Sequence, residues 1–256
     1  MKLSTHNLIL RYGSLTAVER ISVCFEPGEL TIMVGPNGCG KSTFLRACAG
    51  LKTPDEGEVK LDDQLLEQFS ARNRAQQIAL LPQSPITPAG LTVRGLIHYG
   101  RHPHQGLFQR RSRSDDVIIE EAMRDTDIVE LAERRVDQLS GGQRQRCWLA
   151  MILAQQASVI LLDEPTSMLD IGHQCEILSL ARQLAHAGKT VVIVLHDLLA
   201  AARYADRLLA FKEGHLMACG RPSMVLTPEL IRATYGIDAK IFHPEGESAP
   251  VVIPQM

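Results

Sequence analysis

The sequence predicts an α/β fold built on a parallel sheet, and three observations indicate it. An apolar segment at residues 29–35 runs directly into the glycine-rich stretch GPNGCGKST at residues 35–43. Two further apolar runs, VILLDE at 159–164 and TVVIVLHD at 190–197, are continuous, as expected for strands buried on both faces. Between them, HQCEILSLARQLAHAG has the helical spacing of a crossover connection.

The other elements of this core follow in chain order. Short strands are expected at HNLIL (6–10) and ISVCFEPGE (21–29), with a turn between them. After the glycine-rich stretch, KSTFLRACAG predicts a helix that Gly50 closes. EGEVKLDD at 56–63 and IALLP at 78–82 predict two more strands.

A helical insert of about 65 residues is expected to interrupt this core. Its start is marked by a stretch rich in Pro, Gly and His at residues 84–106, which breaks the α/β rhythm. Ser114 is the expected N-cap of a helix whose apolar residues recur at three- and four-residue spacing. GGQRQRCWLAMILAQQ at 141–156 predicts a second helix.

Composition narrows the class of protein. The chain has 256 residues with 45% hydrophobic content, enough for a full α/β core. A net charge of −2 argues against a dedicated nucleic-acid binder. Six scattered cysteines without a C-x-x-C pair indicate reduced, cytosolic thiols. We see no signal-peptide pattern and no apolar run near the roughly 18 residues of a membrane span, so a membrane role would need a partner.

The stretch GPNGCGKS matches G-x-x-x-x-G-K-[ST] in full, with a strand expected before it and a helix after it. Its glycines let backbone N–H groups wrap phosphates, Lys41 reaches the β- and γ-phosphate oxygens, and the Ser42 hydroxyl can ligate Mg²⁺. A chance glycine turn is the alternative, which this context disfavours. The sequence therefore predicts a nucleotide site.

Polar residues at the ends of the expected strands add to this site. Asp163 is placed to hold Mg²⁺ through a water, and Glu164 to orient and deprotonate an attacking water. His196 ends the neighbouring strand, where it can hold the γ-phosphate and that water in register, although a merely capped histidine is a real alternative. Gln83 can contact Mg²⁺ or the water, although an ordinary loop glutamine fits the sequence nearly as well. Tyr12 can stack on a purine, but taken alone a core or surface tyrosine is the favoured interpretation.

A second anion-binding turn is expected at LSGGQRQR, residues 139–146. It places Ser140 and two glycines directly before a helical pattern, so that bare N–H groups and the positive helix end face outward together. One chain thus carries two such turns but only one apparent nucleotide site.

These motifs together resemble the ATPase subunits of ABC proteins. GPNGCGKST, LPQ, LSGGQRQR, VILLDEP, SMLD and VLHD occur in the order found in that family, and the resemblance covers residues 8–236. It implies a single ABC ATPase domain over residues 1–256, with a RecA-like P-loop core and an antiparallel β subdomain. Within it we expect the nucleotide-binding core and β subdomain at 1–83 and 155–220, a helical subdomain at 84–154 and a C-terminal extension at 221–256.

The resemblance also implies a role for each motif residue. Two subunits would stack head to tail, and the signature turn of one would cap the γ-phosphate held by Lys41 of the other, so the chain would form a dimer with two shared sites. Glu164 would be the catalytic base, His196 the switch histidine and Gln83 the γ-phosphate sensor, while Asp163 would serve Mg²⁺. The residues expected to contact ATP or complete its site are Tyr12, Gly35, Pro36, Asn37, Gly38, Cys39, Gly40, Lys41, Ser42, Thr43, Ser140, Gly141, Gly142, Gln143 and Asp170, and those expected at Mg²⁺ are Ser42, Gln83 and Asp163. Met168 departs from the family, where a small residue is common, and we expect it to alter packing only.

A narrower resemblance points to bacterial importers. YGRHPHQGLF, LDEPTSMLDIGHQ and LTPELIRATYGI are similar to the ATPases of ferric-siderophore importers, and haem and cobalamin importers share much of this pattern. The resemblance implies a polytopic permease, an extracytoplasmic substrate-binding protein and a location on the cytoplasmic face of the inner membrane. Residues 83–105 would lie under the permease. A non-transport ABC ATPase is the alternative of another class, but it would carry a long coiled coil or a second cassette, and neither is present.

Three other features have simpler interpretations. His98, His102 and His104 lack a nearby acid or cysteine, so a partner-facing loop is favoured over a metal site. The basic run QRRSRSDD at 109–116 is expected to be a solvated face, with lipid headgroups as an alternative. Cys39 lies within the phosphate loop, whose N–H groups would favour a thiolate, so we expect alkylation to block ATP binding.

Overall fold

A six-stranded sheet forms the centre of the molecule. The computed structural model describes residues 1–87, 89–106, 112–167, 169–244, 246 and 249–255. The sheet order is β10-β9-β3-β8-β7-β6, with every pairing parallel except β9 with β10. Its strands are β3 (Leu30–Val34), β6 (Ile78–Leu81), β7 (Val159–Asp163), β8 (Thr190–Val194), β9 (Arg207–Lys212) and β10 (His215–Gly220).

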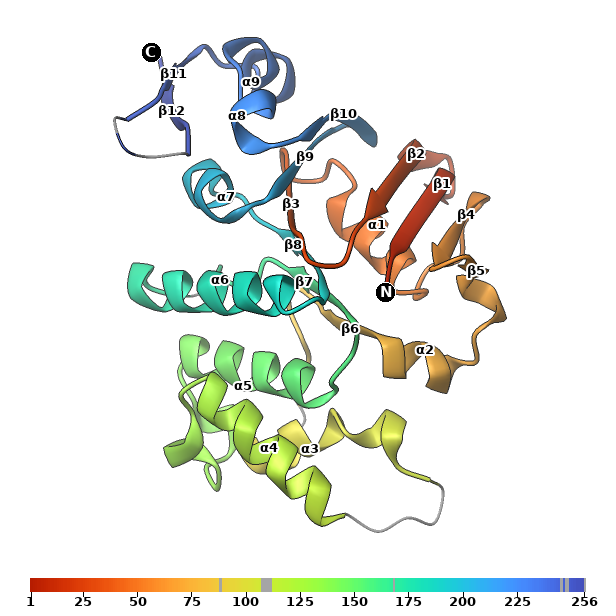
Figure 1. Ribbon diagram of the computed structural model, residues 1–256, viewed down its shortest axis with the longest axis vertical. Helices are drawn as coiled ribbons and strands as arrows, with labels where there is room; N and C mark the ends of the chain where they lie inside the picture. Colours follow the sequence, from red (N-terminus) through yellow and green to blue (C-terminus); the bar gives the residue numbers. More distant parts are fainter. Residues whose placement is uncertain (88, 107–111, 168, 245, 247–248, 256) are drawn as a thin grey trace.

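The two faces of this sheet are both buried, which explains why its central strands are apolar throughout. Successive side chains alternate between faces, so Ile32 joins one core cluster and Met33 joins another. The Met33 face packs against α1 (Lys41–Cys48), where Phe44 contacts Phe25 and Phe211. The opposite face is covered by α6 (Ile171–His186), α7 (Leu198–Tyr204) and part of α5 (Gly141–Ala154) (Figure 1). The α/β fold class predicted from the sequence is confirmed.

A second, antiparallel sheet adjoins this core (Figure 1). Its order is β2-β1-β4-β5, built from β1 (Leu3–Tyr12), β2 (Leu15–Phe25), β4 (Glu56–Leu61) and β5 (Gln64–Leu65). Strands β1 and β2 are longer than the sequence pattern indicated, and a tight turn at Gly13, with φ of 59°, joins them. Short elements then lead to β6: the 3₁₀ turn η1 (Leu66–Gln68) and α2 (Ala71–Gln77).

Helices α3 (Val93–Tyr99), α4 (Arg113–Asp125) and α5 gather at one end of the molecule around their own apolar cluster (Figure 1). The connecting 3₁₀ turns are η2 (His102–His104), η3 (Val129–Leu131) and η4 (Val136–Gln138). Helix α3 falls in the Pro- and Gly-rich stretch where the sequence indicated only a break. Residues 107–111, which include the start of the predicted basic run, lie outside the described residues.

The predicted N-cap of α4 is wrong. Ser112, not Ser114, caps this helix, and its hydroxyl accepts from the Asp115 N–H while the Asp115 carboxylate accepts from the Ser112 N–H. This capping box needs an acidic or amide residue three positions after the serine, and only Ser112 has one that turns back to it. Ser114 instead lies inside the first turn, with its hydroxyl 2.7 Å from that of Ser112.

The C-terminal segment packs onto the core. Helices α8 (Pro222–Val225) and α9 (Pro228–Tyr235) contact β9 and β10, and a two-stranded sheet of β11 (Ala239–Phe242) and β12 (Val251–Pro254) follows. Strand β12 contacts α7. The sequence left open whether this tail packs, and through these two strands it does.

Candidate functional site

The glycine-rich stretch forms a cradle between β3 and α1. A Cβ at Gly35 would lie 2.2 Å from the Phe211 carbonyl oxygen, and one at Gly40 would lie 2.1 Å from that of Ala17, so neither position accepts a side chain. Both residues also have positive φ, 147° and 101°. The path of this loop is therefore one that only glycine allows at these two positions, and a loop of this kind can offer backbone N–H groups to phosphates.

Lys41 lies in this cradle, at the first position of α1, and only 5% of it is exposed. Its ammonium donates to the carbonyl oxygens of Gly35 and Pro36, each at 2.8 Å, and lies 3.6 Å from the Cys39 sulfur. No carboxylate takes part in these contacts, so the cation keeps a charge that an incoming anion can neutralise.

Two buried carboxylates face the cradle from the end of β7. Asp163 is 5% exposed and Glu164 is 9% exposed. Burial raises the pKa of Asp163, the Ser42 hydrogen bond opposes that shift, and the Glu164 charge adds to it. Ser42 Oγ lies 3.1 Å from Asp163 Oδ1, so a hydroxyl and a carboxylate, both good Mg²⁺ ligands, meet at one point.

The Glu164 carboxylate lies between the side chains of Gln83 and His196. Gln83 Nε2 donates to its Oε2 at 2.7 Å, and His196 Nε2 contacts its Oε1. Glu164 also has a φ of 52°, a strained conformation for a residue with a long side chain. Its N–H donates to the Val194 carbonyl of the adjacent strand β8, which holds this conformation in place. Residues that follow three different strands, β6, β7 and β8, therefore fix the position of this carboxylate.

A cleft of about 560 Å³ opens over these groups. Eleven of the residues predicted from the sequence line it: Tyr12, Asn37, Gly38, Cys39, Gly40, Lys41, Ser42, Thr43, Gln83, Glu164 and His196. Sequence reasoning missed Leu15 and Ala17, which also line it. They lie two residues apart on β2, and that period-two spacing just after Gly13 was the available signal. Lys52 Nζ, also missed, lies 4.6 Å from the centroid of the Tyr12 ring.

The predicted signature turn does not line this cleft. Ser140 is the N-cap of α5, in a capping box with Gln143, and its side chain is exposed. Gly141 and Gly142 begin the helix with no side chain to cover its free N–H groups. Asp170 likewise lies elsewhere, as the N-cap of α6, where the His173 N–H lowers the pKa of its carboxyl. Met168 lies outside the described residues.

The match to known families decides the class. The family model described as ABC transporter matches residues 18–167, which contain the cradle, the acidic pair and the signature turn. The chain belongs to the ABC transporter ATPase family. It is an ATPase, and ATP is its nucleotide.

The curated relatives of this ABC ATPase match it over nearly its whole length. The ferric enterobactin transport ATP-binding protein FepC of Escherichia coli is 44% identical over 99% of this chain and 94% of the relative. The hemin import ATP-binding protein HmuV of Rhodococcus jostii is 43% identical over 95% of this chain and 82% of the relative.

Solved structures show the same fold. A metal-chelate type ABC transporter in an inward-facing conformation has a TM-score of 0.85 at 27% identity, covering 99% of this chain and 97% of that one. The dimeric cassette MJ0796 has a TM-score of 0.79 at 26% identity, covering 86% and 98%. Across the part of this chain that the structure describes, we find no helix with the length and apolar content of a membrane span.

Proposed function

We propose that this chain is the ATP-hydrolysing subunit of a bacterial importer for ferric siderophores, acting through a partner permease in the inner membrane. The observation that carries the proposal is full-length similarity at 41–44% identity to ATP-binding proteins named for ferric enterobactin, petrobactin, hydroxamate and achromobactin transport. Haem import is a second candidate, because two hemin import proteins match at 43% and 41% identity. A substrate-binding protein outside the membrane would deliver the chelate.

Within the cleft, each side chain has a role that its position supports. The backbone N–H groups of the glycine-rich loop and Lys41 bind the β- and γ-phosphates, and Tyr12 stacks on adenine. Ser42 and Asp163, with Gln83 nearby, would hold Mg²⁺, which supplies charge neutralisation at the phosphates when bound. Glu164 accepts a proton from the attacking water, while His196 and Gln83 hold the carboxylate toward that water.

A second copy of the chain would complete the site. The signature turn begins helix α5 with Gly141 and Gly142, next to the exposed Ser140, and lies outside the chain's own cleft. The helix N–H groups at these two glycines suit the γ-phosphate of a nucleotide bound to another subunit. Because each γ-phosphate would gain contacts from both chains, ATP binding and dimerisation would be linked reciprocally. Asp170 would lie near the same interface. Hydrolysis would weaken it and reopen the dimer.

The permease would dock beside the 3₁₀ turn η2, on the predicted segment 83–105. A cavity of about 650 Å³ opens there, and the described residues that line it include an arginine, a tyrosine and a histidine: Arg72, Ala75, Tyr99, His102, Pro103, Gln105 and Gly106. Tyr99 is 56% exposed, and its ring lies 6.5 Å from that of His102. An exposed aromatic beside polar groups is typical of a surface that a protein partner covers.

The decisive experiment is reconstitution with co-purified permease and binding protein in vesicles. We expect ATP-driven uptake of a ferric siderophore, with haem or cobalamin transported poorly or not at all. Uptake of haem in preference to the iron chelate would favour the second candidate. Copurification with ribosomes or DNA, and no permease, would contradict an importer altogether.

A further inference from the structure

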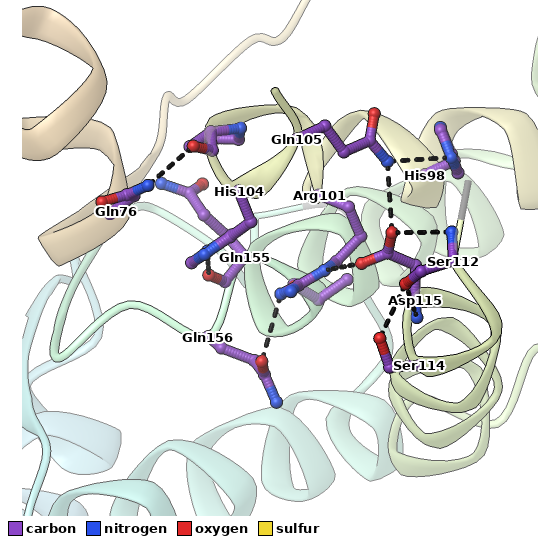
Figure 2. Close-up of polar contacts among 12 residues, drawn as sticks. Gln76, His98, Arg101, His104, Gln105, Ser112, Ser114, Asp115, Gln155 and Gln156 are labelled. Atoms are coloured by element: carbon purple, nitrogen blue, oxygen red, sulfur yellow. Dashed lines mark hydrogen bonds and ion pairs between the residues drawn. The ribbon is translucent and has the colours of Figure 1, made fainter. Parts of the chain in front are cut away.

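An ion pair between Arg101 and Asp115 is buried in the helical region, outside the ATP cleft. Each residue is 6% exposed, and Arg101 Nε donates to Asp115 Oδ1 at 2.8 Å (Figure 2). The other carboxylate oxygen accepts from the Ser112 N–H at 3.3 Å and the Gln105 side-chain amide at 3.4 Å. A buried pair is tolerated only when its remaining hydrogen-bonding capacity is used in this way.

The same arginine also donates hydrogen bonds at the end of α5. Arg101 Nη1 donates to the Ala154 carbonyl oxygen at 2.7 Å and to Gln156 Oε1 at 3.1 Å. His104 Nε2 lies 2.8 Å from the Gln155 carbonyl oxygen. Carbonyls at a helix C-terminus lack partners within the helix, and a cation is the favoured group there. The segment 101–105, which we call the docking turn, is therefore fastened to the last residues of α5.

The docking turn is also bonded to the core. Arg72 Nε and Nη2 donate to the carbonyl oxygens of Pro103 and Gln105 at 2.9 and 2.6 Å, and Gln76 Nε2 donates to Pro103 at 2.8 Å. Gln155 in turn donates to the carbonyls of Ala75 and Ile78. Figure 2 shows Gln76 of α2, Asp115 of α4 and Gln155 at the end of α5 around this turn.

Helix α5 connects this joint to the signature turn. It begins after Ser140 and runs for 14 residues to Ala154, a length of about 21 Å at the usual rise per residue. Next to the docking turn, Gly100 packs so closely on α5 that a Cβ there would lie 2.3 Å from the Met151 carbonyl oxygen. A helix of this length, packed this closely at one end, can transmit a displacement of the docking turn to the signature turn.

We propose that the Arg101–Asp115 pair is a positioning device that fastens the docking turn to the C-terminal end of α5, so that this turn and the signature turn at Ser140–Gln143 move together. The inference rests on the proposed permease contact for its physiological role. Movement of the docking turn by the permease then changes the position of the groups that complete the neighbouring ATP site, and ATP binding changes the docking turn in return.

The charge state of the pair suits this role. Burial alone would raise the pKa of Asp115, but the hydrogen bonds from Arg101, Ser112 and Gln105 outweigh it and lower the pKa to about 2. The carboxylate is thus charged at any pH the cell meets. Apolar residues of similar volume would stabilise the fold as well or better, but they lack the directional bonds that set one orientation of the turn.

The test uses the double variant Arg101→Met with Asp115→Leu, because a single change would leave a buried charge and risk misfolding. In a Glu164→Gln background, hydrogen exchange is followed before and after adding MgATP. In the parent, we expect both the signature turn and residues 101–106 to change protection. In the double variant, the signature turn should still respond and the docking turn should not.

A second experiment measures ATP hydrolysis with and without the permease, in proteins that retain Glu164. The double variant should keep the permease-free rate and lose the permease-stimulated increment by about tenfold, within the usual range of coupling energies. Arg101→Lys should recover part of the increment, since it restores the charge but not the planar fork. The matched control is Arg146→Met with Asp127→Asn, an ion pair of the same helical region with a 3.3 Å contact that lies outside the proposed permease segment 83–105, and it should behave as the parent does.

A double variant whose docking turn responds to MgATP as the parent's does would overturn the proposal, and so would equal loss of coupling in the control pair. If the parent itself shows no stimulation by an iron-chelate permease, the proposed function fails, whereas the hydrogen-exchange comparison still decides the positioning role.

Discussion

Two buried polar clusters among the described residues differ in how completely their charges are matched. At the ATP cleft, Asp163 and Glu164 are adjacent carboxylates, and the pKa of Asp163 is raised because it is buried beside another acid. In the helical region, Asp115 is opposite an arginine, and its pKa is lowered. The first cluster is incomplete without a cation or substrate, and the second is complete within the chain. Incomplete clusters indicate where a ligand binds, and complete ones indicate where the chain itself must be held.

The largest effect is expected at the incomplete cluster, for the variant Glu164→Gln. We expect turnover to fall by about 10²–10⁴-fold, the usual contribution of a general base, while MgATP binding is retained and closed dimers accumulate. Steady-state hydrolysis and size-exclusion chromatography with MgATP measure the two effects. Brisk hydrolysis by this variant would remove Glu164 from the role of base.

Breaking the complete cluster should cost stability instead. Arg101→Met leaves the Asp115 carboxylate buried without its main partner, so we expect the free energy of unfolding to fall by about 3–5 kcal/mol. Urea denaturation of the nucleotide-free protein measures it. The double variant with Asp115→Leu should recover most of the loss; no recovery would mean that the arginine acts mainly through Ala154 and Gln156.

The free energy of unfolding at acidic pH tests the same Arg101–Asp115 pair. The pKa of Asp115 is about 2 in the folded protein against an ordinary value of 3.8, which corresponds to about 2 kcal/mol. Because the folded pKa is the lower one, this stabilisation is complete above about pH 4 and is lost as the pH falls toward 2. Unfolding free energies of the parent and of the Arg101→Met, Asp115→Leu variant, compared across this window, should differ in slope. Equal slopes would contradict the assignment.

The smallest expected effect is a gain. Asp163→Asn removes a buried charge but keeps an oxygen to accept from Ser42, so the nucleotide-free protein should be more stable by about 1 kcal/mol. Burial and the neighbouring Glu164 charge raise the pKa of Asp163, so the fold disfavours its charged form. The gain in the free energy of unfolding is therefore expected at neutral pH, where the carboxyl of the parent protein is ionised. Thermal unfolding measures it, and Mg²⁺-dependent ATP binding should be lost in the same variant. A destabilised Asp163→Asn would mean that the carboxylate is well solvated.

The sequence predicted the structure best where a local pattern of residues is compatible with a single backbone conformation. A strand, a glycine-rich turn and a helix in succession require the cradle around Lys41, because positive φ and close backbone contacts admit only glycine there. The helix capped by Ser112 shows that one local pattern was overlooked. Two serines precede the same apolar spacing, but only Ser112 has an acidic residue, Asp115, three positions later.

The α/β class and the order of β3, α1, β6, β7, α6 and β8 could be predicted from the sequence, because hydrophobic periodicity acts over short distances along the chain. The phosphate-loop residues came from their motif, and the other predicted cleft residues rested on the family resemblance. Packing was needed to show that Gln83 and His196 hold Glu164 from either side, that Leu15 and Ala17 line the cleft, and that Arg101 is bonded to Asp115 and the end of α5. The physical reason is that these contacts join residues on different elements. Their partners are chosen by how the elements pack, and no local pattern of residues records that choice.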